Sequence, residues 1–226
     1  MDIIASGNTA DIIEQENNMI CKFFKTNYPL IYIEHKFNNV KSIRGLGIDT
    51  PTPYKMIHLD GRNGILYERV IGETLYSKLK DVTNEEREAW IDKFAGLHRK
   101  VLSHHVDNVI DFKDFLKIHA SNSSDVISRI DALKNGDCLL HGDFHPGNVM
   151  VDAYNRLILI DMMNICRGPA EYDVARTYFL LEGNKEFQNK YLKYMGYKVK
   201  ELIPYLEVIM LIREKELKQQ NRIDYL

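Results

Sequence analysis

Residues 141–148 read HGDFHPGN, and this run constrains the chain more than any other stretch of it. Asp143 stands five residues before Asn148, and Asn148 stands thirteen residues before Asp161. The residues between Asn148 and Asp161 predict a hairpin, with strands at 148–151 and 157–160 and a turn at 152–155. We therefore expect the hairpin to bring Asn148 and Asp161 side by side.

The residue types in this run suit the transfer of a phosphoryl group. Such a reaction depends on aligning the attacking and leaving oxygens and on neutralising the phosphates with Mg²⁺. Mg²⁺ takes oxygen ligands, so Asn148 and Asp161 are the predicted metal ligands. Asp143 is then the predicted catalytic base, which accepts the proton of the attacking hydroxyl group. The alternative is an ordinary turn, because these residue types are common in turns, but a turn does not explain two strands that both end in metal-ligand side chains.

The run and the segment after it resemble the aminoglycoside phosphotransferase and choline kinase-like family, which are small-molecule kinases with the protein-kinase-like fold. The second segment, residues 161–177, reads DMMNICRGPAEYDVART. The resemblance implies an α+β, bilobal protein-kinase-like fold with a small antiparallel-sheet N-terminal lobe and a mainly helical C-terminal lobe. It also implies that His141 and Asp173 support the catalytic loop. From the residues alone, Asp173 is equally a carboxylate that starts a helix.

The first third of the chain predicts strands and one helix. Apolar runs at 11–14 and 19–24 indicate a hairpin, and strands are expected at 54–59 and 64–70. Between Pro29 and Val40, apolar residues recur at spacings of three and four, which is the pattern of one helix face. Helices follow at 74–79 and at 83–102, where Thr83 and Glu86 form a capping box. The expected lobes are residues 1–70, which bind the nucleotide, and residues 71–226, which carry the catalytic and substrate-binding residues.

The resemblance assigns a phosphate-binding pair to the first lobe. It implies that Lys22, in the strand 19–24, pairs with Glu34 in the helix and holds the α- and β-phosphates. Taken singly, a lysine on a strand is more often a solvated residue at an edge.

Two further segments of the first lobe resemble nucleotide-binding elements. The segment before the first expected strand looks like a shortened phosphate-covering loop with one glycine, and its residues are Ser6, Gly7, Asn8 and Thr9. Residues 67–70 look like the interlobe hinge, where the main chain of Glu68 and Val70 would contact adenine. The simpler interpretations are an N-terminal turn and the end of a central strand.

Composition excludes several other classes of function. The net charge is −2 and the isoelectric point is about 6.5, so the chain has no electrostatic signature of nucleic-acid binding. The three cysteines have no C-x-x-C spacing, which indicates reduced thiols. The apolar runs are far shorter than a membrane span, and the N-terminus lacks a basic region. We expect a soluble cytoplasmic protein with no nucleic-acid or membrane partner, and we make no prediction of its oligomeric state.

The resemblance therefore implies an ATP-dependent phosphotransferase that uses ATP and Mg²⁺. Its partner would be a small-molecule substrate with a hydroxyl group, which is aminoglycoside-, amino alcohol- or sugar-like. One alternative is a protein or lipid kinase of the same fold, although no Asp-Phe-Gly follows the hairpin. The other is a non-catalytic nucleotide-binding module, which would not need Asp143.

Two other expectations concern the second lobe. His98, His104 and His105 lie near the end of the long helix, where a surface role or an interaction with the helix terminus is expected. Residues 202–217 predict an amphipathic helix, with an apolar face formed by Leu202, Leu206, Ile209, Met210 and Ile212.

Overall fold

The structure is a computed structural model that describes residues 3–7, 9–120 and 123–223. The chain divides into two compact units: residues 1–81 with 146–164, and residues 82–145 with 165–226. The first unit thus extends past the expected lobe boundary at residue 71 and includes the hairpin that carries Asn148 and Asp161.

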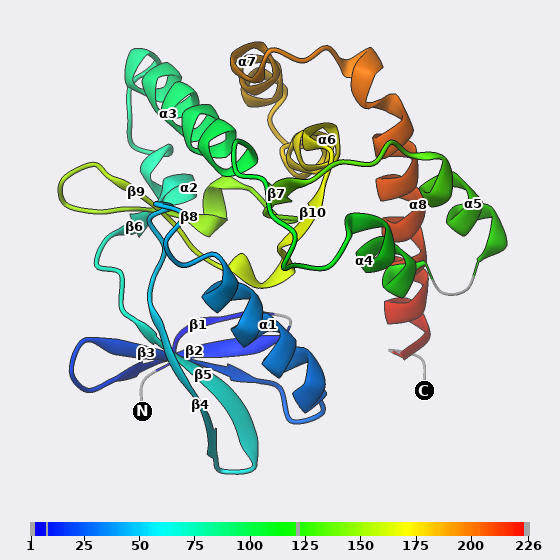
Figure 1. Ribbon diagram of the computed structural model, residues 1–226. Helices are drawn as coiled ribbons and strands as arrows, with labels where there is room; N and C mark the ends of the chain where they lie inside the picture. The colour runs from blue at the N-terminus through cyan, green and yellow to red at the C-terminus, as the bar shows by residue number, and fades with distance from the viewer. Residues whose placement is uncertain (1–2, 8, 121–122, 224–226) are drawn as a thin grey trace. The chain divides into compact units, whose positions relative to one another are not determined.

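An antiparallel five-stranded sheet forms the centre of the first unit (Figure 1). Its strands are β1 (Ile3–Ser6), β2 (Ala10–Gln15), β3 (Met19–Phe24), β4 (Pro53–Leu59) and β5 (Arg62–Glu68), in the order β1-β2-β3-β5-β4. The turns that join β2 to β3 and β4 to β5 contain residues with positive φ, at Asn17 and Asn18 and at Asp60 and Gly61. Such turns match the twist of the strands, and Asn, Asp and Gly adopt them at least cost.

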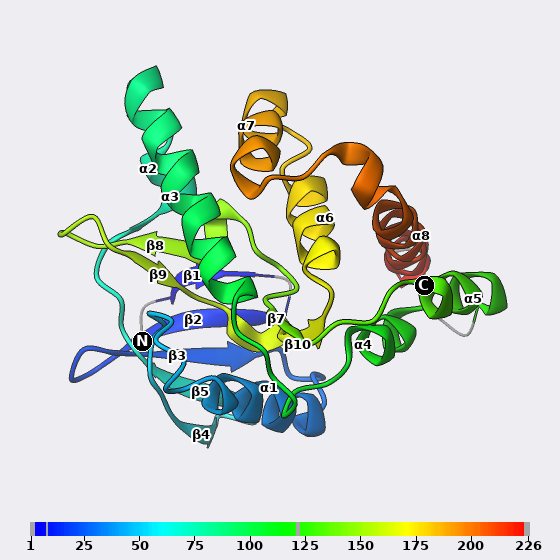
Figure 2. The same cartoon turned by 45° about the horizontal axis from the view of Figure 1, so that its top comes forward.

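One helix and a small second sheet complete the first unit. Helix α1 (Leu30–Ser42) buries Ile33, Phe37 and Val40 and packs against β4 and β5, alongside the sheet in Figure 2. The second sheet orders β6 (Glu73–Thr74), β8 (Val149–Val151) and β9 (Leu157–Leu159), and it confirms the predicted hairpin after Asn148. The short helix α2 (Leu75–Lys78) and the 3-10 turns η1 (Pro146–Asn148) and η2 (Met162–Asn164) connect these elements.

The second unit is mainly helical. Helix α3 (Asn84–Leu102) begins with the predicted capping box, because Thr83 and Glu86 exchange side-chain and backbone hydrogen bonds. The other helices are α4 (Phe112–His119), α5 (Ser124–Ala132), α6 (Ala170–Leu180), α7 (Lys185–Met195) and α8 (Val199–Ile223). Helix α3 packs against α7, and α6 packs against α8. Strands β7 (Cys138–Leu140) and β10 (Cys166–Gly168) form an antiparallel pair.

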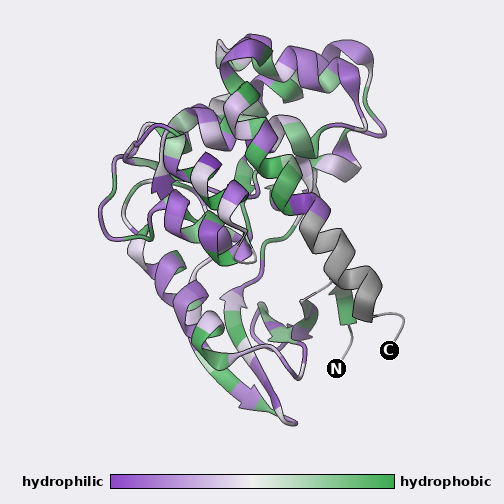
Figure 3. Ribbon diagram, turned by 90° about the vertical axis from the view of Figure 1, so that its right-hand side faces the viewer, coloured by the Kyte–Doolittle hydropathy of each residue, from purple (hydrophilic) through white to green (hydrophobic). Residues whose placement is uncertain are grey.

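Aromatic side chains fill the core of the second unit. The rings of Phe94 and Phe144 lie 4.5 Å apart between centroids, and Phe187 and Tyr191 contact the same Phe94 ring. The helices of this unit carry both hydrophobic and hydrophilic segments in Figure 3, as expected for helices that cover a core. Among the described residues, no helix is both long and apolar enough to span a membrane.

The buried face of α8 differs in part from the predicted one. Leu202, Ile209 and Ile212 are buried as expected, whereas Met210 is 58% exposed. Tyr205 and Val208 are buried instead, which gives a buried stripe at spacings of three and four residues.

Candidate active site

A cavity of about 600 Å³ lies within the first unit, and most of the predicted nucleotide-binding residues line it. This volume is in the range of small-molecule sites. The predicted site residues in its lining are Ser6, Gly7, Thr9, Lys22, Glu68, Val70, Asn148 and Asp161. They come from the five-stranded sheet, from the strand end at residues 68–70 and from both ends of the β8–β9 hairpin.

The alternation of side chains along β3 places Lys22 at this cavity. Cys21 and Phe23 pack in an apolar cluster with Ile13 and Leu66. Since successive residues of a strand point to opposite faces, Lys22 points to the other face, where Ile12 and Ile20 also line the cavity. The ammonium of Lys22 is therefore held in a partly apolar wall, with 15% of its side chain exposed.

Lys22 forms an ion pair with Asp161, and its Nζ lies 2.8 Å from Oδ1 of the carboxylate. Asp161 has φ = +59°, a left-handed conformation that is uncommon outside glycine and is found at functional sites. The amide of Ile160 donates to the carbonyl of Asn148 at 2.9 Å, so the two predicted metal ligands stand at adjacent strand ends. An amide oxygen and a carboxylate are hard donors that suit Mg²⁺.

Glu34 lies on the exposed side of α1. Within the described part of the chain, the ammonium of Lys22 pairs with Asp161 rather than with Glu34. On the same helix, Lys36 donates to Oδ1 of Asn164 at 3.2 Å. The pairing of Lys22 with Glu34 therefore stays a prediction, and it requires Lys22 to leave the carboxylate of Asp161.

The predicted phosphate-covering loop begins at Ser6, the last residue of β1, which is a strand outside the predicted set. Two of its donors already have partners: the Ser6 hydroxyl donates to Asp11 at 2.7 Å, and the Gly7 amide donates to the Ala10 carbonyl at 2.9 Å. Asn8 lies outside the described residues. Ser6 and Gly7 would have to release these bonds before they could bind a phosphate.

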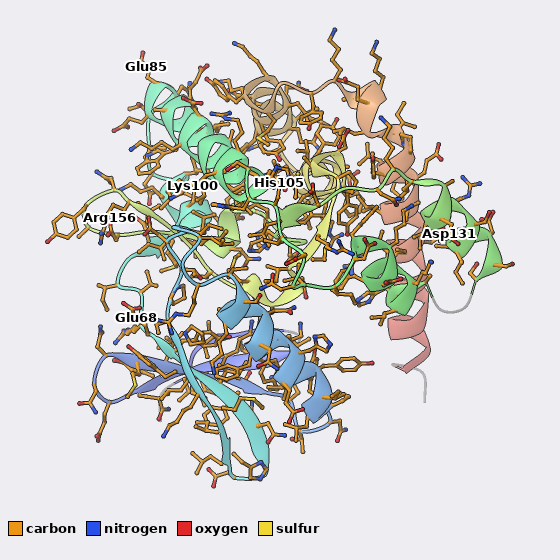
Figure 4. All side chains as sticks on the ribbon, viewed as in Figure 1. Glu68, Glu85, Lys100, His105, Asp131 and Arg156 are labelled. Atoms are coloured by element: carbon orange, nitrogen blue, oxygen red, sulfur yellow. The ribbon has the colours of Figure 1, made fainter. Side chains whose placement is uncertain are left out.

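The predicted hinge, residues 67–70, overlaps the end of β5, whose last residue is Glu68. Glu68 is labelled in Figure 4. Its amide donates to the Thr52 carbonyl at 2.9 Å, and its carboxylate accepts from the Thr52 amide at 3.2 Å. These bonds fix the end of the strand beside the cavity. The amide of Val70 makes no hydrogen bond with any other described residue, so it is available to a ligand.

Asp143, the predicted base, lies in the second unit with a cationic or basic group beside each carboxylate oxygen. Arg176 of α6 places Nη2 3.5 Å from Oδ1, and His145 places Nε2 3.7 Å from Oδ2. Burial raises the pKa of Asp143, whereas His145, Arg176 and His141 lower it. The lowering is larger than the raising, so the pKa lies below its usual value. The carboxylate is thus ionised near neutral pH, as a proton acceptor must be.

Asp173 supports the loop that carries Asp143 through the main chain. Its carboxylate accepts from the amide of His141 at 2.7 Å and from the amide of Gly142 at 2.9 Å. The side chain of Asp173 is fully buried. Burial raises its pKa, but the hydrogen bond from His98 and the neighbouring His141 lower it below the usual value.

His98 completes this buried network, and the expectation of a surface role for it is wrong. Its Nε2 lies 3.0 Å from Asp173 Oδ2, and its Nδ1 lies 2.7 Å from the Tyr191 hydroxyl. Because an ionised carboxylate only accepts hydrogen bonds, Nε2 is the donor to Asp173. The ring also stacks on Phe144, which follows Asp143 in the loop, with centroids 4.0 Å apart. No local pattern could reveal this role, since Asp173 and Tyr191 are 75 and 93 residues away.

His105 does lie at the surface. It is 66% exposed and pairs with Asp137 at 2.8 Å, beside Cys138. This group is separate from the contacts made by Asp143 and Asp173.

Comparison with known proteins connects this site to a family. Residues 110–196 match the family model APH, described as the phosphotransferase enzyme family. The matched range contains Asp143, Asn148, Asp161 and Asp173, although Lys22 lies outside it. No curated protein matches the chain.

Solved structures of aminoglycoside phosphotransferases share the fold. The streptomycin–ATP ternary complex of APH(2'')-IIa has 18% identity and a TM-score of 0.61, covering 92% of this chain and 80% of that one. The GDP complex of a mutant aminoglycoside 2'-phosphotransferase IIIa has 14% identity and a TM-score of 0.69, covering 99% and 87%. APH(3'')-Id from Streptomyces rimosus has 13% identity and a TM-score of 0.67, covering 92% and 91%.

These identities are low, so the structural likeness concerns the fold, while the family match concerns the segment that contains residues 141–148. The chain thus has the kinase-like α+β fold of aminoglycoside phosphotransferases. Residues 110–196 match the phosphotransferase enzyme family, and this match confirms the predicted resemblance and the predicted enzyme class, a kinase-type phosphotransferase.

Proposed function

We propose that this protein transfers the γ-phosphoryl group of ATP to a hydroxyl group of a small molecule. The observation that carries the proposal is the cavity of the first unit, where Lys22, Asn148 and Asp161 line one space with the strand end at Glu68 and Val70. A nucleotide-binding site needs a main-chain group that can contact the edge of adenine, a cation for the phosphates and oxygen ligands for the metal. This cavity offers all three.

The purine would lie against the wall formed by residues 68–70. The amide of Val70 is available as a donor to a ring nitrogen, while the bonds of Glu68 to Thr52 keep the segment in place. Among the structural neighbours, one is a complex with ATP and another with GDP. We propose ATP as the phosphoryl donor, and the preference for an adenine or a guanine nucleotide can be measured.

Asn148 and Asp161 are the residues that would hold Mg²⁺. Their oxygen donors fit this ion, and their adjacent strand ends allow both to reach one ligand. When bound, Mg²⁺ supplies positive charge that stabilises the phosphates. Asp161 now binds the ammonium of Lys22, so Lys22 would exchange this carboxylate for a phosphate oxygen when the nucleotide enters.

Asp143 is the proposed proton acceptor. The hydroxyl oxygen of the acceptor forms a bond to the γ-phosphorus, the bond from that phosphorus to the bridging oxygen breaks, and ADP leaves with the electron pair. The hydroxyl proton passes to Asp143, whose pKa lies below its usual value. His141 and Asp173 hold the loop for this step, because Asp173 fixes the two amides that precede Asp143.

The proposal is tested by incubating the purified protein with γ-³²P-labelled ATP, Mg²⁺ and panels of amino alcohols, aminoglycosides, sugars and peptides. Labelled product from a small hydroxyl compound is the expected result, with Asp143→Asn as the negative control. Labelled peptide alone would favour a protein kinase. Binding of MgATP without transfer to any acceptor would favour a non-catalytic module and contradict the proposal.

A further inference from the structure

The guanidinium of Arg176 is the feature of the second unit that neither the family resemblance nor the proposed chemistry uses. Arg176 lies on α6, three residues after Asp173, and its Nη2 is 3.5 Å from Asp143 Oδ1. The side chain is 25% exposed, and that of Asp143 is 28% exposed. A ligand that reaches the base from solvent can therefore also reach this cation.

Most of the hydrogen-bonding capacity of Arg176 is unused within the described part of the chain. A guanidinium carries five N–H donors in a planar fork. One of them makes a hydrogen bond with Asp143 at the upper limit of distance, and the ring of Phe179 lies 5.9 Å from Cζ. A planar fork with free donors is the usual partner of a carboxylate or phosphate group, which it binds through two parallel bonds.

The charges around Asp143 disfavour a cationic acceptor. Arg176 is beside one carboxylate oxygen, and His145 is 3.7 Å from the other. An ammonium group brought to this base would meet a permanent positive charge at close range, whereas an anionic group would meet a favourable one.

We infer that the acceptor carries an oxyanion, a carboxylate or a phosphate, a few bonds from the hydroxyl that is phosphorylated, and that Arg176 binds it. The inference rests on the proposed function and narrows it from small hydroxyl compounds in general to hydroxy acids or their phosphate counterparts. Arg176 is then a residue that determines specificity, and Asp143 remains the proton acceptor for the same hydroxyl group.

The test uses acceptors that differ in one charged group. The pairs are glycerate and glycerol, gluconate and glucose, and serine and ethanolamine, with glycerol 3-phosphate to separate phosphate from carboxylate and kanamycin as a polycation. Transfer from MgATP is measured for the wild type, Arg176→Lys, Arg176→Gln and Arg129→Gln. Arg129 lies on α5 in ion pairs with Asp125 and Glu207, so its substitution is a matched change of charge elsewhere in the unit.

We expect the wild type to prefer the member that carries the carboxylate over its partner without one by at least tenfold in kcat/KM. Arg176→Gln should lower that ratio by at least tenfold, mainly through a higher KM, and Arg176→Lys should lower it less. Arg129→Gln should leave the ratio unchanged. If Arg176→Gln instead reduces turnover equally for all acceptors and for slow hydrolysis of ATP by water, Arg176 only positions Asp143 and the inference is wrong.

Equilibrium binding separates this inference from the proposed function. The same acceptors are titrated into protein saturated with a non-hydrolysable ATP analogue and Mg²⁺. Binding of an anionic acceptor that depends on Arg176, without transfer from ATP, would support the inference and contradict the proposed function. A wild type that prefers neutral or cationic members in both assays, or that binds none of the anionic ones, would overturn the inference.

Discussion

At the scale of single residues, the groups proposed for catalysis, loop support and metal binding are carboxylates whose states are set by their neighbours. Asp143 and Asp173 are both buried enough for desolvation to oppose ionisation, yet both have a lowered pKa because cations and N–H donors face them. Asp161 is more exposed and is bound by Lys22. The three carboxylates thus have different environments. That of Asp143 suits a base, that of Asp173 suits a support of the loop, and that of Asp161 suits a metal ligand.

Replacing Asp143 tests the assignment of the base. Asp143→Asn keeps the size of the side chain but cannot accept the hydroxyl proton, so turnover should fall by about 10²-fold or more. The affinity for MgATP should change little, because the residues proposed to bind the nucleotide are others. Steady-state assays and isothermal titration measure the two quantities. Turnover within threefold of the wild type would remove Asp143 from the mechanism.

The lowered pKa of Asp143 makes a second prediction. The base acts as a carboxylate, so activity is present above its folded pKa and is lost as the pH falls through it. Since that pKa lies below the usual value of about 3.9, activity should not decline between pH 7 and 5 through this group. His145→Gln removes the side-chain interactions of His145 that contribute most to lowering the pKa of Asp143. The acid limb of kcat/KM should then move to higher pH, and an unmoved limb would assign it to another group.

The ion pair of Lys22 is tested by a double-mutant cycle on the free energy of unfolding. Lys22→Met and Asp161→Asn should show a coupling of about 0.5–1 kcal/mol, since the pair is partly exposed and screened. The matched cycle of Lys22→Met with Glu34→Gln should show coupling near zero. A larger coupling with Glu34 would restore the pair expected from the sequence and would show that α1 lies differently in solution.

At the scale of elements, a buried polar network joins three helices of the second unit to the loop that carries Asp143. Tyr191 of α7 contacts His98 of α3, which donates to Asp173 of α6, and Asp173 accepts from the loop amides. A buried network of this kind is costly to interrupt, because each remaining polar group loses its partner without gaining water.

Substitutions in this network should therefore destabilise the second unit in graded amounts. His98→Leu leaves Asp173 without its side-chain donor and should cost about 1–3 kcal/mol, while Tyr191→Phe should cost about 0.5–1.5 kcal/mol. The folded pKa of Asp173 is lowered, so its contribution to stability is present above the unfolded pKa and is lost as the pH falls through the folded one. Urea unfolding should show the deficit of His98→Leu at pH 7 and a smaller deficit once the pH is below the folded pKa of Asp173.

The elements that could be predicted from the sequence are those whose signals are local. The capping box of α3, the hairpin turns and the helical spacing of Ile33, Phe37 and Val40 are local signals, and they are confirmed. Leu30, the first residue of that predicted helix face, is 47% exposed instead. Strand β1 was missed because all of its residues are exposed and no apolar alternation marks it. Helix α4 is not among the predicted elements, although it too has a local signal, the cap at Asp111 before the buried Phe112 and Leu116.

Residues whose roles depend on distant partners could not be predicted. Strands β7 and β10 have three residues each and exist through their mutual pairing. The contact of Arg176 with Asp143 spans 33 residues, and that of Lys22 with Asp161 spans 139. A sequence pattern gives the type of such a residue, whereas its partner is fixed by the packing of the whole unit.

At the scale of the whole molecule, the division into two units assigns the proposed groups unevenly. Asp143 and Asn148 stand five residues apart, yet Asp143 belongs to the second unit and Asn148 to the first. The first unit contains Lys22, both proposed metal ligands and the strand end proposed for the purine. Every group proposed to bind MgATP is therefore found within that unit.

Nucleotide binding should for this reason protect the first unit most strongly against hydrogen exchange. At a ligand concentration 100 times the dissociation constant, openings that release MgATP become about 100-fold rarer, a stabilisation of about 2.7 kcal/mol. Mass spectrometry should locate this protection in β2 and β3, at residues 66–70 and at residues 147–163. Asp161→Ala should abolish most of the protection by MgATP while leaving that by metal-free adenosine, whose proposed contacts are at residues 68–70. Protection concentrated in α4, α5 or α7 would place the nucleotide in the second unit and refute the proposed site.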